Sequence, residues 1–427
     1  MKCIGVMTGN SLDAVDVVIT EFAQNHMRDI CGHSHLIPLA LAQDFRLLKE
    51  RIKQADGHVR RVFDEDKASF MQLHDSYIHL VAQTISETLD KAGLNPQDIE
   101  IIGFHGQTCA HCPPSIAKGK PYTVQVGSGQ MLADLTGIKV AYDFRSDDVL
   151  NGGEGAPLAP VHNMHLALNL RKEGIFPVAF CNGGNTGNIS LITTDKNQKI
   201  RVLGWDTGPF NHFADMLTLR EKGEPYDKDG KYGAPGNLNE ELLRTLFEQA
   251  VVTESGKNYL MQPPPKSSDP AWYRFLPEMM DGSIPFCDRL RTVEFFSAYA
   301  FVYNLKYIPA DFDKPSYFLT FGGGWNNPVV QKDFERLLHG EAKALPEHQA
   351  VFETIANPKA IVTPASKFGS DSRFMEARIF ADMAWCLLQK EPFSYPETTG
   401  CREPVVGGIV AVPNGGDKRL WSRAALD

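Results

Sequence analysis

The chain has 427 residues, 43% of them hydrophobic, which is enough for two domains that each bury a core. Its formal net charge of −9 argues against a nucleic-acid-binding surface, because phosphate recognition needs clustered lysine and arginine. The sequence has no run of about 18 apolar residues, so no membrane span is expected. Residues 1–9 lack the apolar region and cleavage site of a signal peptide, so we expect a cytoplasmic protein.

Strand-like and helix-like segments alternate through the first part of the chain, which is typical of an α/β fold. A long amphipathic helix is expected from about residue 66 to residue 92, where Gly93 ends it, and a shorter helix is expected at 161–171. The expected strands of this part are residues 2–8, 15–22, 35–41, 98–104, 122–126 and 139–142.

The pattern restarts at Phe176 with a strand, a glycine turn at 182–187 and a second strand. This repeats the strand, glycine turn and strand that open the chain, and it favours two similarly built lobes, residues 1–174 and 175–427. In the second lobe we expect a helical insertion between Phe213 and Val302. The other elements expected there are strands at 177–181, 188–193, 200–203 and 317–320 and helices at 209–220 and 373–389.

Asp206 lies in the segment Gly204-Trp205-Asp206-Thr207-Gly208-Pro209, between an expected strand and an expected helix. Pro209 suits the first position of a helix, because that position needs no N–H group. The start of a helix also attracts anions, so Asp206 is predicted to face a phosphate or a reacting hydroxyl group. The alternative is that Asp206 only caps the helix, which is the common use of this residue type.

Four glycine turns each follow a strand and each adjoin an acidic or small polar residue. They span residues 9–13, 183–187, 206–208 and 322–324. Glycine lets a backbone approach a polyphosphate closely, and the backbone N–H groups then supply the contacts. Asp13 is predicted to hold Mg²⁺ through water, because this ion keeps much of its hydration shell. The cysteines around His111 lack a second ligand pair at similar spacing, so we expect no zinc site there.

This layout is similar to that of the sugar kinase, actin and heat-shock ATPase superfamily. More narrowly, the chain resembles the anhydro-N-acetylmuramic acid kinase family over nearly its whole length. The resemblance is carried by blocks at residues 5–13, 105–108, 143–148, 152–158, 204–209, 225–229, 264–267, 322–324, 376–377 and 399–400.

The resemblance implies two ribonuclease-H-like lobes with a nucleotide cleft between them, and it implies ATP and Mg²⁺ as cofactors. Family members open the 1,6-anhydro bridge of the sugar with water and phosphorylate O6 in the same event. Asp206 matches the general base, which takes a proton from the water that attacks C1. The resemblance also implies a homodimer and a role in peptidoglycan recycling.

Further site residues follow from the same resemblance. The residues expected to bind ATP and its phosphates are Gly9, Asn10, Ser11, Asp13, Gly184, Asn185, Thr186, Gly187, Asn188, Gly322, Gly323 and Gly324. The residues expected to contact the sugar are Gln107, Arg145, Asp148 and Asn211, with Arg145 as the partner of a substrate carboxylate. Glu376 is expected to face the nucleotide cleft.

Two residues near the expected sugar site depart from the family's pattern. Phe210 stands where glycine is usual and adds bulk beside Asp206, and Glu154 stands where glutamine is usual and adds a charge. These departures leave other functions open: a kinase for another anhydrosugar, an ordinary hexose kinase, or a nucleotide-binding homologue without catalysis.

Overall fold

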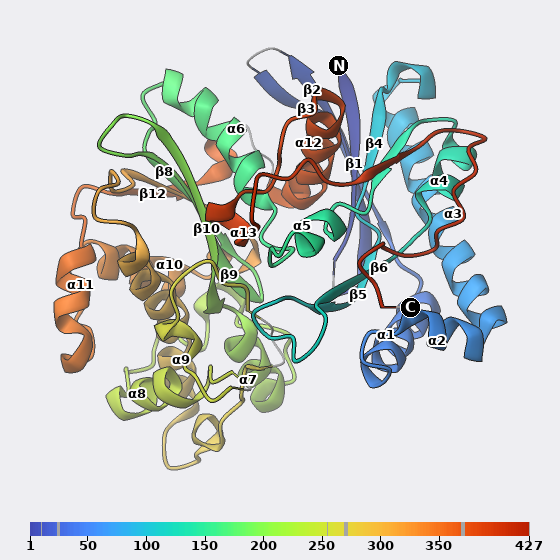
Figure 1. Cartoon of the computed structure of the whole chain (residues 1–427). Helices are drawn as coiled ribbons and strands as arrows, with labels where there is room; N and C mark the ends of the chain where they lie inside the picture. The colour runs from blue at the N-terminus through green and yellow to red at the C-terminus, as the bar shows by residue number, and fades with distance from the viewer. Residues whose placement is uncertain (10, 24–25, 254, 269–271, 369–371, 427) are drawn as a thin grey trace. The chain divides into compact units, whose positions relative to one another are not determined.

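The chain forms two units, each with its own sheet (Figure 1). The first comprises Met1–Asn169 and Gly369–Asp427, and the second comprises Leu170–Phe368. The structure, a computed structural model, describes residues 1–9, 11–23, 26–253, 255–268, 272–368 and 372–426.

The C-terminal segment belongs to the first unit, whereas the sequence placed all of residues 175–427 in the second lobe. The physical reason is the packing of helix α12 (Met375–Gln389) against strands β1, β2 and β4 of the first sheet (Figure 1). Two glycines permit this packing. A Cβ atom on Gly5 would lie 1.8 Å from the carbonyl oxygen of Ala377, and one on Gly103 would lie 1.9 Å from that of Phe380.

The sheet of the first unit has the order β13-β7-β4-β1-β2-β3. Strands β1, β4 and β7 are parallel, β2 and β3 follow β1 as an antiparallel meander, and β13 pairs antiparallel with β7. The strands are β1 (Lys2–Thr8), β2 (Ala14–Ala23), β3 (His26–Leu36), β4 (Ile101–Phe104), β7 (Val140–Tyr142) and β13 (Ile409–Ala411). Strands β5 (Gln107–Cys112) and β6 (Tyr122–Val126) form a separate two-stranded sheet.

The long helix expected from the sequence is confirmed as α3 (Lys67–Ala92). Asp66 accepts a hydrogen bond from the backbone N–H of Ser69 at its start, and Gly93 ends it in the left-handed conformation. The strand expected at 35–41 is wrong: β3 ends at Leu36 and α1 begins at Leu39, directly after Pro38. The other helices are α1 (Leu39–Gln54), α2 (Val59–Glu65), α4 (Gly129–Thr136), α5 (Ser146–Leu150), α6 (Ala159–Lys172) and α13 (Pro396–Thr399).

The sheet of the second unit has the order β10-β9-β8-β11-β12. The two sheets share one topology over five strands. In the first sheet β1 lies between β2 and β4, with β3 beyond β2 and β7 beyond β4; in the second, β8 lies between β9 and β11, with β10 beyond β9 and β12 beyond β11. The strands are β8 (Val178–Gly183), β9 (Thr186–Thr194), β10 (Ile200–Pro209), β11 (Tyr317–Phe321) and β12 (Ile361–Pro364). The helices are α7 (His212–Lys222), α8 (Glu240–Gln249), α9 (Phe286–Tyr303), α10 (Pro328–Leu338) and α11 (Gln349–Ile355).

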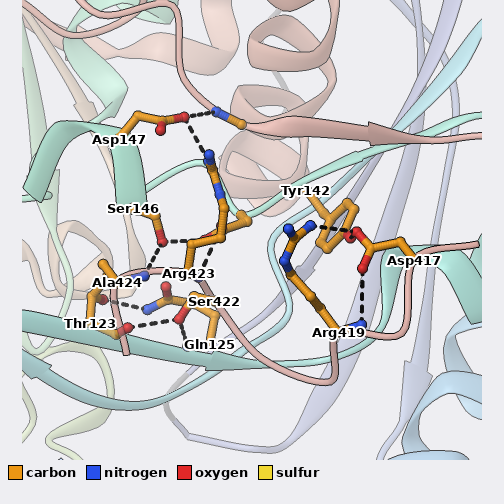
Figure 2. A network of polar contacts seen from close by, with 12 residues as sticks. Thr123, Gln125, Tyr142, Ser146, Asp147, Asp417, Arg419, Ser422, Arg423 and Ala424 are labelled. Atoms are coloured by element: carbon orange, nitrogen blue, oxygen red, sulfur yellow. Dashed lines mark hydrogen bonds and ion pairs between the residues drawn. The ribbon is translucent and has the colours of Figure 1, made fainter. Parts of the chain in front are cut away.

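The end of the chain is fixed to the first unit by a polar network (Figure 2). The guanidinium of Arg423 donates to Asp143 over 2.6 Å and to Asp147 over 2.7 Å. Next to it, the hydroxyl of Ser422 donates to the carbonyl oxygen of Thr123. These contacts hold the last residues on β6, on the loop before α5 and on α5 itself. Among the described residues, no helix has the length and apolarity needed to cross a membrane.

Candidate functional site

Asp206 lies inside strand β10, so the prediction that it sits at a strand-to-helix turn is wrong. Its backbone pairs with Asn188 on β9, and a β-bulge between Asp206 and Gly208 lets the ladder continue to Pro209. Helix α7 starts only at His212, with Asn211 before it, so Asp206 does not cap the helix and Pro209 is not its first residue. The bulge displaces the strand locally at the position of Asp206.

The carboxylate of Asp206 is held by the segment that follows Lys266. Its Oδ2 accepts from the N–H of Ser268 at 2.8 Å and from the hydroxyls of Ser267 at 3.3 Å and Ser268 at 3.4 Å. Among the described residues, none donates a hydrogen bond to Oδ1 of Asp206.

Burial raises the pKa of Asp206 to about 6, although the hydrogen bonds from Ser267 and Ser268 and the charge of Lys266 act in the opposite direction. A carboxylate with such a pKa is ionised near neutrality and is a stronger base than an ordinary aspartate. Burial also lowers the pKa of Lys266 to about 7, with Lys306 adding to the shift. The ammonium of Lys266 lies over the rings of Tyr259 and Tyr307.

The second glycine turn lies between β8 and β9, beside the start of α7. The carbonyl oxygen of Gly184 accepts from the N–H of Asn211 at 3.1 Å, and that of Asn185 accepts from the N–H of Phe210 at 3.0 Å. The hydroxyl groups of Thr186 and Tyr273 are 3.1 Å apart, and Tyr273 also contacts Ser268. A chain of hydroxyl groups therefore links the expected phosphate turn, residues Gly184–Asn188, to Asp206.

The expected adenosine loop borders a cavity of about 650 Å³ in the second unit. Gly323, Gly324 and Asn211 line this cavity, so the structure brings three predicted residues together. Gly322 has a φ of +97°, which favours glycine, and a Cβ atom on Gly324 would lie 2.2 Å from Oδ1 of Asn211. The cavity is large enough for a nucleoside.

Four acidic residues line this cavity that the sequence did not identify as site residues: Asp215, Asp227, Asp229 and Glu294. Asp227 and Asp229 belong to the block at residues 225–229. Burial raises the pKa of Asp215 to about 7 and, with a contribution from Asp227, that of Glu294 to about 8. Asp215 was within reach of sequence reasoning, because it follows Asn211 by four residues and therefore lies on the same face of α7. No local signal identifies Glu294, which lies on α9.

The first glycine turn follows β1. The hydroxyl of Ser11 donates to Oδ1 of Asp13 at 2.5 Å, and the N–H of Leu12 donates to the carbonyl oxygen of Gly9 at 3.2 Å. Asp13 and Ser11 are exposed, as a residue that binds hydrated Mg²⁺ has to be. Asn10, also expected to bind phosphate, lies outside the described residues.

Arg145 occupies a fixed position in the first unit. Its Nε donates to Nε2 of His105 at 3.0 Å, and its Nη1 donates to the carbonyl oxygen of Gly155 at 2.6 Å. Burial, followed by the charge of Arg145, lowers the pKa of His105 well below the usual value, so this ring is neutral and accepts the bond. Gln107, two residues after His105, begins β5 and is fully buried. Its Oε1 has no hydrogen-bond partner among the described residues.

Asp148 is fully buried and organises the glycine-rich loop. Its Oδ2 accepts from the N–H of Gly155 at 2.7 Å, and its Oδ1 accepts from the hydroxyl of Thr399 at 2.6 Å. Both oxygens thus bond to the protein, and Asp148 positions the loop that Arg145 contacts. Its predicted contact with the sugar stays a prediction.

Glu376 lies in the first turn of α12 and keeps accessible surface. Its pKa is raised by desolvation and then by the charges of Asp16 and Asp13, while Arg145 acts to lower it. Glu376 therefore shares its surroundings with Asp13, the predicted Mg²⁺ residue.

The two departures from the family's pattern are accommodated by packing. Phe210 is 1% exposed and its ring lies 4.7 Å from that of Trp325, so it fills the core of the second unit. Glu154 is buried and accepts hydrogen bonds from the N–H and the hydroxyl of Ser115. The ring of Phe210 therefore packs in the core, and the carboxylate of Glu154 is bonded by Ser115 inside the protein.

Two units with one sheet topology, glycine turns after strands and a partly buried aspartate with a raised pKa define a two-lobed α/β protein of the sugar kinase type. A model of the family described as anhydro-N-acetylmuramic acid kinase matches residues 1–413. The chain belongs to this family.

Curated relatives agree along nearly the full length. The anhydro-N-acetylmuramic acid kinase of Methylorubrum populi is 32% identical over 420 residues, which cover 96% of this chain and 99% of the relative. The one of Zymomonas mobilis is 32% identical over 417 residues, with the same two coverages.

Solved structures are more distant. The activator of the 2-hydroxyisocaproyl-CoA dehydratase from Clostridium difficile has a TM-score of 0.38 at 10% identity, covering 91% of this chain and 96% of its own. A ROK family glucokinase from Streptomyces griseus has a TM-score of 0.35 at 13% identity, covering 90% and 99%. The assignment to the family does not depend on these likenesses.

Proposed function

We propose that the chain is an ATP-dependent kinase that opens the 1,6-anhydro ring of anhydro-N-acetylmuramic acid with water and phosphorylates O6, giving N-acetylmuramic acid 6-phosphate. The observation that carries this proposal is the environment of the Asp206 carboxylate in a chain that belongs to this family. Its carboxylate is held through Oδ2, its Oδ1 accepts no hydrogen bond from the described residues, and burial raises its pKa to about 6. Asp206 takes the proton of the water that attacks C1.

The residues around the expected nucleotide fit such a ligand. The cavity beside Gly323 and Gly324 accepts a nucleoside, the turn Gly184–Asn188 offers backbone groups to phosphates, and exposed Asp13 suits a hydrated Mg²⁺. ATP with Mg²⁺ supplies the phosphoryl group and neutralises charge on it. The role of the protein's own residues is to hold that group in line with O6.

The sugar is bound by Arg145, Gln107 and Asn211 in this proposal. Arg145 is fixed by His105 and Gly155, so its guanidinium is ready to pair with the lactyl carboxylate of the substrate. Asp148 acts as a positioning residue through the loop at Gly155. We expect the reaction to take place in the cytoplasm, in a homodimer that serves peptidoglycan recycling.

The test is turnover of ATP with a panel of 1,6-anhydrosugars and ordinary hexoses, following ADP release and the phosphorylated product. We expect turnover with anhydro-N-acetylmuramic acid, and the Asp206→Asn variant should lose it by about 10²-fold or more. Asp311→Asn is the control, because Asp311 is exposed and away from this network.

Each contrary result has a distinct meaning. Turnover that survives Asp206→Asn overturns the role of the base. Phosphorylation of a hexose without ring opening identifies a direct sugar kinase. Binding of ATP without sugar-dependent ADP release identifies a non-catalytic homologue.

A further inference from the structure

Two histidines and a glutamate meet on the outer side of the first unit, on elements that the proposed reaction does not use. His33 and His35 are two residues apart on β3, the edge strand of the sheet, so both side chains lie on the same face. Helix α3 packs against this strand and brings Glu87 to the two rings.

The three side chains converge on one point. Oε2 of Glu87 lies 2.9 Å from Nε2 of His33 and 3.1 Å from Nδ1 of His35. One potential ligand atom from each residue lies within 4.8 Å of the others. The side chains are 19%, 30% and 34% exposed for His33, His35 and Glu87, so solutes reach them although the protein restrains them.

These distances are close to those of a zinc coordination sphere. Tetrahedral Zn²⁺ with bonds of about 2.0–2.1 Å keeps its ligand atoms about 3.3 Å apart. The two N–O distances of 2.9 and 3.1 Å are therefore within a few tenths of an ångström of this separation, and the two nitrogens lie no more than 4.8 Å apart. Two imidazoles and one carboxylate are also the donor set that borderline divalent cations prefer over Mg²⁺.

We propose that His33, His35 and Glu87 form a binding site for Zn²⁺ or a similar divalent transition-metal ion, with water completing the coordination. The ion replaces the proton that each ring nitrogen now shares with Glu87, and that proton moves to the other ring nitrogen or to solvent. This site ties the edge strand β3 to helix α3, and it is independent of the proposed kinase activity.

Two neighbouring residues adjust the site in opposite directions. Nε2 of Gln83 donates to Oε1 of Glu87 at 2.9 Å, which orients the carboxylate and leaves Oε2 facing the rings. The ammonium of Lys91 lies 2.7 Å from Nδ1 of His33. It repels a cation and donates to the nitrogen that has to carry the proton when Nε2 binds a metal. Lys91 therefore competes with the metal.

The test is titration of the tag-free full-length protein with Zn²⁺ by calorimetry, with Mg²⁺ in excess to saturate magnesium sites. We expect one Zn²⁺ per chain, and weakening by about tenfold or more in each of His33→Ala, His35→Ala and Glu87→Gln. His79→Ala is the matched control, since His79 is an exposed histidine on the same helix outside the cluster. It should bind Zn²⁺ like the wild type.

Lys91→Met provides a second, opposite readout. Removing the competing ammonium should tighten Zn²⁺ binding by about threefold or more at low salt. Circular dichroism of each variant verifies that it folds, and Co²⁺ absorption reports the ligand set separately. Absence of Zn²⁺ binding, or binding that the three ligand substitutions leave unchanged, overturns the proposal and leaves a hydrogen-bonded cluster.

Discussion

At the scale of single residues, the chemistry of Asp206 depends on a balance between burial and hydrogen bonding. Burial raises its pKa to about 6, while donors from Ser267 and Ser268 limit the rise. The result is a base that is ionised at neutral pH and still takes a proton readily. The same balance makes the residue a source of pH dependence in both activity and stability.

The activity should depend on the ionisation of Asp206. Below pH 6 the carboxyl group is protonated and cannot act as a base, so kcat/KM should fall about tenfold per pH unit there. Lys266→Met removes a positive charge that lowers the pKa of Asp206, so the acid limb should move to higher pH by less than about one unit.

Lys306→Met is the control for that shift, because Lys306 acts on the pKa of Lys266 and is not among the groups that shift Asp206. A pH–rate profile of the three proteins checks the prediction. An acid limb that stays in place in Lys266→Met would contradict the assigned charge effect.

Asp206→Asn should make the folded protein more stable at pH 8. The pKa of Asp206 in the folded protein lies above the usual aspartate value of 3.8, so ionisation between about pH 4 and pH 6 costs stability. Asparagine avoids this cost and still accepts from the N–H of Ser268. We expect a gain of about 1 kcal/mol, seen as a thermal midpoint higher by ~2–4 °C at pH 8.

The same measurement at pH 4 is the internal control, because the wild-type carboxyl group is then largely protonated and the difference should shrink. A thermal midpoint for Asp206→Asn below that of the wild type at pH 8 would show that burial does not dominate at this residue.

At the scale of elements, close packing of α12 on the sheet depends on two glycines. Gly103→Ala places a methyl group 1.9 Å from the carbonyl oxygen of Phe380, which forces the helix away from β4. We expect a loss of about 3 kcal/mol in the free energy of unfolding. Urea unfolding measures the loss, and faster hydrogen exchange in β1 and β4 would localise it.

Gly119→Ala is the matched control, since no atom lies within 4 Å of the added Cβ and its φ is not positive. Its stability should stay within about 0.5 kcal/mol of the wild type. Equal effects of the two substitutions would mean that α12 does not pack on β4 in this way.

Elements with strong local signals were predictable from the sequence, and elements decided by tertiary pairing were not. The cap at Asp66 and the stop at Gly93 fixed the bounds of α3. The end of β10 was misplaced, because Gly204, Gly208 and Pro209 read as turn residues. In the structure, the ladder to β9 continues past them through a bulge. Pairing with a neighbouring strand outweighed local propensity there.

For the site, the family resemblance provided residue types and the structure provided their surroundings. Gly323 and Gly324, predicted to bind ATP, and Asn211, predicted to contact the sugar, line one cavity. The full burial of Asp148 and the core position of Phe210 depend on contacts with Thr399 and Trp325, which are distant in sequence. A single sequence carries no record of such contacts.

At the scale of the whole molecule, the chain returns to its first unit and ends there. The family model matches residues up to 413, and the C-terminal tail that Arg423 holds in place lies beyond them. Arg423 pairs with Asp143, whose side chain is 2% exposed and which immediately precedes Phe144 and Arg145. The tail therefore supports the loop that carries a proposed sugar contact.

Arg423→Ala should destabilise the first unit and weaken sugar binding. Removing the guanidinium leaves the buried carboxylate of Asp143 without its ionic partner, a loss of about 3 kcal/mol in the free energy of unfolding. Because Arg145 follows on the same loop, KM for the anhydrosugar should rise more than kcat falls. Arg419→Ala is the control, since Arg419 is about half exposed and pairs with Asp417 near the surface. An exposed pair contributes less than about 1 kcal/mol. Equal unfolding midpoints and equal KM values for the two variants would show that the tail does not support the sugar site. A loss of stability and a rise in KM in Arg423→Ala alone would show that residues near Arg423 help to position the sugar-binding loop.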